Sequence, residues 1–176
     1  SLSTKLIRIG ASLLVVALAS ISLTLWVTWQ LEGGAAAVNE AGRMRMQTWR
    51  LASAVQTGLD PVELGSLVNQ FDESLRLLRA GDPMRPLFVP WDETVDLRFE
   101  LVDRIWAERR SQWLAVPPMG AAESARAAEE FVKAIDGLVL AIEHQLSRLT
   151  AILNLFQFVM MALAIIGAVV MLFTGY

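Results

Sequence analysis

Three arginines lie between residues 38 and 50, and one of them occupies a position that a packed helix would bury. The segment is Val38-Asn39-Glu40-Ala41-Gly42-Arg43-Met44-Arg45-Met46-Gln47-Thr48-Trp49-Arg50. Apolar and small residues recur around Arg45 at alternating spacings of three and four, the interior pattern of a packed helix: Val38, Ala41, Arg45, Thr48, Ala52, Val55 and Leu59. Arg43 and Arg50 fall on the other, solvent-facing side. The sequence thus predicts that Arg45 is a buried cation, and such a cation needs an anionic partner.

The chemistry that this arginine could perform is anion binding. Its partner could be an acid on another helix, or its guanidinium could extend to the surface, or it could hold an exogenous anion. Gly42, one turn away, would let a ligand approach the helix. In a parallel homodimer, the two copies of Arg45 would face each other, and a small planar oxyanion between them could accept paired hydrogen bonds from both.

Enzymatic chemistry has little support in this chain. It has one histidine, no cysteine and no glycine-rich phosphate loop. His144 has no second metal ligand three or four residues away, so it is interpreted as structural or exposed. The acidic clusters Asp72-Glu73 and Asp92-Glu93-Asp96 are interpreted as solvated helix surfaces. No catalytic residue, metal or cofactor is expected, and no nucleic-acid partner.

Two uncharged apolar runs flank a charged middle region. They cover residues 9–29 and 151–174, and each is long enough to cross a bilayer as a helix. A signal peptide is the alternative for the first run, but its length exceeds the usual apolar core of such a peptide. Lys5 and Arg8 precede the first run and place residues 1–8 in the cytoplasm. Residues 30–150 then form a periplasmic domain, and residues 175–176 are a truncated cytoplasmic end. This predicts a two-pass protein of the bacterial inner membrane, in contact with the lipid bilayer.

Turn-forming residues divide the middle region into four helical segments. The first helix continues from the membrane to about Gln56, with Gly33-Gly34 as a possible weak point. The second begins at Asp60-Pro61, the third at Trp91-Asp92, and the fourth runs from about Ala121 to Phe173. The predicted fold is all-α: an antiparallel up-down-up-down four-helix bundle that is continuous with two transmembrane helices.

The segment 38–50 also resembles a conserved motif of the nitrate/nitrite sensor histidine kinases of the NarX and NarQ type. That motif, the P-box, has the pattern Asn-x-Ala-Gly-x-x-Arg-Met-Gln-x-x-Arg, and it is matched by Asn39, Ala41, Gly42, Arg45, Met46, Gln47 and Arg50. The resemblance implies that Arg45 from each subunit contacts nitrate or nitrite and that Gly42 lines the site. It implies structural roles for Asn39, Ala41, Met46, Gln47 and Arg50.

On this resemblance, the chain is expected to sense nitrate or nitrite outside the cytoplasm, as a homodimer. A helix displacement would carry the signal to a cytoplasmic histidine kinase, and through it to a response regulator, in modules that this chain lacks. The motif is also similar to that of PilJ-type sensor domains of type IV pilus chemotaxis transducers. One alternative is therefore a chemotaxis or pilus transducer with the same fold. A membrane-anchored structural or partner-binding bundle is the other.

Overall fold

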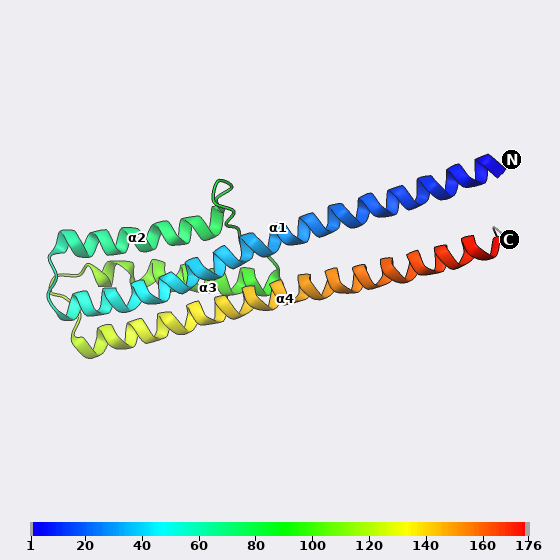
Figure 1. Cartoon of the computed structure of the whole chain (residues 1–176). Helices are drawn as coiled ribbons and strands as arrows, with labels where there is room; N and C mark the ends of the chain where they lie inside the picture. The colour runs from blue at the N-terminus through cyan, green and yellow to red at the C-terminus, as the bar shows by residue number, and fades with distance from the viewer. Residues whose placement is uncertain (1, 175–176) are drawn as a thin grey trace. The chain divides into compact units, whose positions relative to one another are not determined.

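The computed structural model describes residues 2–174 and consists of four helices in that range (Figure 1). They are α1 (Leu2–Gln56), α2 (Pro61–Ala80), α3 (Glu93–Trp113) and α4 (Ala121–Thr174). The only strand-like pairing in this range is an isolated bridge between Asp82 and Leu87. The prediction of an all-α chain is confirmed. The expectation for residues 175–176 lies outside the described residues.

The chain divides into two units, which are described separately. One is the bundle, Gln30–Leu146. In the described range, the other consists of residues 2–29 and 147–174, the outer parts of the two long helices. In this outer unit the helices are apolar, with mean hydropathy up to 2.2 and 2.5, and these windows are not buried. Two exposed helices of this length and composition are consistent with a membrane protein.

Helix ends in the bundle follow the local chemistry of the sequence. Pro61 opens α2, where its missing N–H costs nothing. The Asp92 carboxylate accepts a 2.7 Å hydrogen bond from the Val95 amide and caps α3. Gly81 ends α2 with a φ of 73°, which glycine adopts without strain. Asp60 precedes α2, but its side chain makes no capping hydrogen bond.

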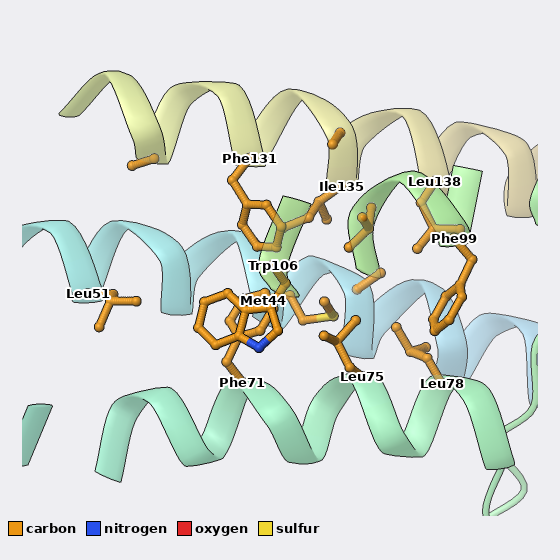
Figure 2. Close-up of a cluster of buried hydrophobic side chains, with 14 of the residues drawn as sticks. Met44, Leu51, Phe71, Leu75, Leu78, Phe99, Trp106, Phe131, Ile135 and Leu138 are labelled. Atoms are coloured by element: carbon orange, nitrogen blue, oxygen red, sulfur yellow. The ribbon is translucent and has the colours of Figure 1, made fainter. Parts of the chain in front are cut away.

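Aromatic and aliphatic side chains from all four helices fill the bundle (Figure 2). Phe71 of α2 stacks on Trp106 of α3 with ring centroids 4.2 Å apart, and it meets Phe131 of α4 at 5.0 Å. Met44 of α1 lies in the same cluster and is fully buried. Leu64, Phe71, Leu75 and Leu78 of α2 and Val95, Phe99, Val102, Trp106 and Trp113 of α3 belong to this core, whereas Leu67 is partly buried against it.

The pair Gly33-Gly34 does not interrupt α1. The helix continues through both residues, and other side chains pack directly against them. A Cβ at Gly33 would overlap the Phe88 ring, and a Cβ at Gly34 would overlap Leu146. The Phe88 amide also donates a 3.3 Å hydrogen bond to the Gly33 carbonyl. The two glycines therefore permit close packing of α4 and of the loop after α2.

Candidate functional site

The core face of the segment 38–50 differs from the predicted one. The buried stripe of α1 runs through Ala37, Ala41, Met44, Thr48, Leu51 and Val55, at alternating spacings of four and three. The prediction that Arg45 lies on the buried stripe is therefore wrong by one residue, or about 100° of rotation. The predicted and the observed stripe share three positions, Ala41, Thr48 and Val55. The fold buries Met44 in place of Arg45 because burial of a thioether is favourable, whereas burial of a guanidinium removes its hydration.

Arg45 lies at the edge of the core and has a partner in the same chain. Its Nη1 donates a 2.8 Å hydrogen bond to Asp136 Oδ1 of α4, and both side chains are 45% exposed. The guanidinium lies over Gly42, 3.6 Å from where a Cβ would stand. Two of the three explanations considered for Arg45 therefore apply at the same time. The side chain extends toward solvent, and it also pairs with an acid on another helix.

The other motif residues fall on different sides of α1. Arg43 and Arg50 are exposed, as the helical spacing predicts. Ala41 and Gln47 are buried, whereas Asn39 and Met46 are exposed. The structural roles that the resemblance implies for these residues remain predictions.

A third face of α1 is largely exposed and forms a regular stripe, although Gln56 at its end donates hydrogen bonds to Ala121 and Ser124 of α4. We call it the α1 outer stripe; its members recur at alternating spacings of four and three: Ala35, Asn39, Gly42, Met46, Trp49, Ser53 and Gln56. Met46 is 57% exposed and Trp49 is 47% exposed. Large apolar side chains on such a seam are typical of a helix that packs on another helix.

Sequence reasoning missed a buried carboxylate in the same motif. Glu40 is only 2% exposed; its Oε1 accepts a 2.8 Å hydrogen bond from the Ser74 hydroxyl, and its Oε2 accepts one of 3.1 Å from Arg85. Ser74 also lies 3.4 Å from the Gln47 side-chain oxygen. The signal was available, because Glu40 and Gln47 flank Met44 at spacings of four and three and therefore share its face.

These polar residues border a groove between α1 and α2. Its volume is about 700 Å³, and Glu40, Arg43, Met46, Gln47 and Arg50 line it from α1. From α2 it is lined by small or polar side chains, among them Gly65, Ser66, Asn69, Gln70 and Ser74. The groove lies on a different side of α1 from the pair of Arg45 and Asp136.

A second polar cluster ties α2 to α3. Asp72 accepts hydrogen bonds from both Nε and Nη2 of Arg110, the shorter of them 2.7 Å, and another of 2.7 Å from the Trp106 indole. Partial burial alone would raise the pKa of Asp72, but the hydrogen bonds from Arg110 and Trp106 and the charge of Arg110 outweigh it, so the pKa lies below its ordinary value. Asp72 was interpreted from the sequence as solvated, and it is instead an interhelical clamp.

Other candidates for chemistry are weak in the described part of the chain. His144 is exposed. Within residues 2–174, no three histidine, cysteine or acidic side chains come together as a group that could hold a metal ion.

Comparison with protein families distinguishes between the two resemblances. Residues 26–131 match the family described as type IV pili methyl-accepting chemotaxis transducer N-term, or PilJ. The match extends over more than half of the chain and includes the motif, α2, α3 and the first turns of α4. The chain belongs to this family. A search of curated proteins gave no match.

Membership of the PilJ family supports the transducer alternative over the nitrate kinase. The resemblance to NarX and NarQ rests on the motif in α1, whereas the PilJ match spans most of the bundle. The specific identity of a nitrate/nitrite sensor kinase is not supported by this match. Signal transduction by a membrane protein remains the common expectation.

Proposed function

We propose that this chain is the extracytoplasmic sensor module and membrane anchor of a homodimeric chemotaxis or type IV pilus transducer. The PilJ match over the bundle is the observation that carries the proposal. The two apolar helical segments supply the anchor, and Lys5 and Arg8 favour a cytoplasmic N-terminus. The module has no catalytic role in this proposal, and its output passes to the cytoplasmic part of a full-length transducer.

The α1 outer stripe supports a parallel dimer. A stripe at heptad spacing meets its own copy across a two-fold axis, and Met46 and Trp49 would be buried there. Gly42 lies between Asn39 and Met46 in this stripe. Because it has no side chain, the two α1 helices of the dimer could approach closely at this point. A rearrangement of this contact would move α1 relative to α4, and both helices continue into apolar segments. A ligand can drive such a change only if it binds the two arrangements with different affinity.

A chimeric transducer would test this role. Residues 1–176 would replace the sensor and spans of a methyl-accepting transducer in cells without that receptor. Because the chain has no cysteine, Ser53→Cys introduces a single thiol on the α1 outer stripe, and Ser111→Cys is the control on the exposed side of α3. Oxidation should crosslink the Ser53→Cys dimer and change the basal output, whereas the control should do neither. A crosslinked dimer with unaltered output would contradict the sensor role.

A small oxyanion at the dimer contact is a second candidate, and one observation favours it. Arg45 is half exposed over Gly42, a member of the α1 outer stripe, so two copies could approach a shared nitrate or nitrite ion. Asp136 would compete with that anion. Asp136→Asn should therefore strengthen nitrate binding measured by calorimetry, and Arg45→Ala should abolish it. Nitrate binding that survives Arg45→Ala would exclude this site.

A further inference from the structure

The groove between α1 and α2 has the dimensions of a small-molecule site. Its volume of about 700 Å³ lies within the range of about 300–1,000 Å³ that ligand pockets occupy. It stays open because α2 presents Gly65 and Ser66 to it, and a Cβ added at Gly65 would meet no atom within 4 Å. Space is therefore available for a ligand along two turns of α1.

The charges that line this groove leave a positive surplus. Glu40 and Glu73 line it, but each is bound by an arginine that is not part of the lining: Arg85 at 3.1 Å and Arg76 at 2.6 Å, respectively. The Arg50 side chain makes no hydrogen bond or ion pair with any residue in the described range 2–174. Arg43 approaches only Glu40, at 3.8 Å. The groove therefore offers two guanidinium groups to an anion.

Gln47 adds a neutral donor between the two arginines. It is one turn from each along α1 and is only 9% exposed. Its side-chain oxygen lies 3.4 Å from the Ser74 hydroxyl, whose single proton is donated to Glu40 at 2.8 Å. The Gln47 amide nitrogen donates to no acceptor in the described residues, and it is not among their buried unsatisfied atoms, so it can donate to a ligand in the groove.

We propose that this groove binds a small organic dicarboxylate. One carboxylate would pair with Arg50 and the other with Arg43, and the Gln47 amide would donate to the ligand between them. The two arginines are seven residues apart, about 10 Å along the helix axis, which is too far for one inorganic oxyanion to bridge readily. Arginine suits this task because its planar guanidinium binds a carboxylate with two parallel hydrogen bonds.

The site lies between α1 and α2 of one subunit and does not use Arg45, but it borders the proposed dimer contact, because Met46 of the α1 outer stripe also lines the groove. It extends the proposed sensor role by naming a ligand class. Its test measures binding and not output, so the ligand assignment and the sensor role can fail independently.

Titration calorimetry on the full chain in lipid nanodiscs would test the proposal. Malonate, succinate, glutarate and adipate serve as probes; succinamide is the uncharged control, and potassium chloride matches the ionic strength. The proposal expects saturable binding with an optimum at one chain length, because the two arginines are anchored on one helix. It is overturned if no dicarboxylate binds, or if chloride reproduces the effect.

Variants connect the binding to the groove. Arg50→Gln and Arg43→Gln should each weaken the best probe at least tenfold, since each removes one carboxylate partner. Gly65→Leu should block the groove without changing a charge. Arg104→Gln, an exposed arginine of α3, is the matched control and should bind as the wild type does. Undiminished binding in both Arg43→Gln and Arg50→Gln, with folding verified by circular dichroism, would place the ligand elsewhere and refute the assignment.

Discussion

At the scale of single residues, the motif in α1 separates three kinds of arginine environment. Arg45 pairs with Asp136 across two helices, Arg43 approaches the buried Glu40, and Arg50 has no partner among the described residues. The sequence distinguished Arg45 from the other two correctly but assigned it to the core. Helical spacing alone could not decide between Met44 and Arg45, because both complete an alternating pattern of three and four.

The partner of Arg45 could not be predicted from the sequence either. Asp136 lies 91 residues away, and only the packing of α1 on α4 brings the two together. Glu40 was easier to find from local spacing, since it lies four residues before Met44 on the same face. Its burial with Ser74 and Arg85 still depends on α2 and on the loop that follows it.

Asp72→Asn tests the clamp between α2 and α3. The pKa of Asp72 is depressed in the folded chain, so its charged form stabilises the fold fully above its ordinary value of 3.8, and that contribution is lost as the pH falls through the lower folded value. At pH 7 the substitution should cost roughly 1 kcal/mol, a figure reduced for solvent screening because the side chain is 38% exposed.

The measurement is unfolding of the bundle followed by near-ultraviolet circular dichroism, in nanodiscs from pH 7 to pH 3. The stability gap between wild type and Asp72→Asn should narrow below about pH 4. Arg110→Gln, which removes the strongest partner, should show the same behaviour. A gap that stays constant over the whole range would contradict the assignment of this carboxylate.

At the scale of elements, the sequence predicted helix boundaries well and loop packing poorly. Proline and glycine limited the helices because their backbone chemistry is local. The connection between α2 and α3 has no regular helix or strand, yet Leu87 and Val89 within it are buried. Their burial depends on the close approach of this loop to Gly33, which no spacing rule reveals.

Glycine substitutions test that packing. Gly33→Ala should destabilise the bundle, because overlap with the Phe88 ring costs about 1–3 kcal/mol whereas helix propensity returns at most about 1 kcal/mol. Gly65→Ala is the matched control in α2, where an added Cβ meets nothing, and it should stabilise by up to about 1 kcal/mol. The midpoint temperatures of thermal unfolding of the two variants should therefore shift in opposite directions from that of the wild type. Shifts of the same sign would argue against close packing at Gly33.

At the scale of the whole molecule, the positions of the charges predict the topology of the chain in the membrane. Residues 30–150 should lie outside the cytoplasm and the N-terminus inside, because Lys5 and Arg8 precede the first apolar run. Single cysteines at Ser111 and Thr4 can report this in intact cells with a membrane-impermeant maleimide. Ser111→Cys should be labelled from outside, and Thr4→Cys only after lysis. The reverse pattern would invert the proposed orientation.

The homodimer was predicted from the sequence only by a symmetry argument and by the resemblance to known families. The motif suggested a parallel dimer around Arg45, whereas the described chain places Arg45 at the edge of its own core and leaves a different seam exposed. Met46 and Trp49 on that seam would lose apolar exposure in a dimer, which favours association by the hydrophobic effect. In the proposed function, the dimer contact connects the fold to sensing.

A cysteine scan of residues 35–56 in native membranes tests this claim most directly. Each variant carries one thiol, since the wild-type chain has none. Under mild oxidation, disulfide-linked dimers should peak at the members of the α1 outer stripe, positions 35, 39, 42, 46, 49, 53 and 56, with minima between them. Uniformly absent crosslinking, or maxima that follow Arg43 and Arg50 instead, would contradict a parallel dimer through this face of α1.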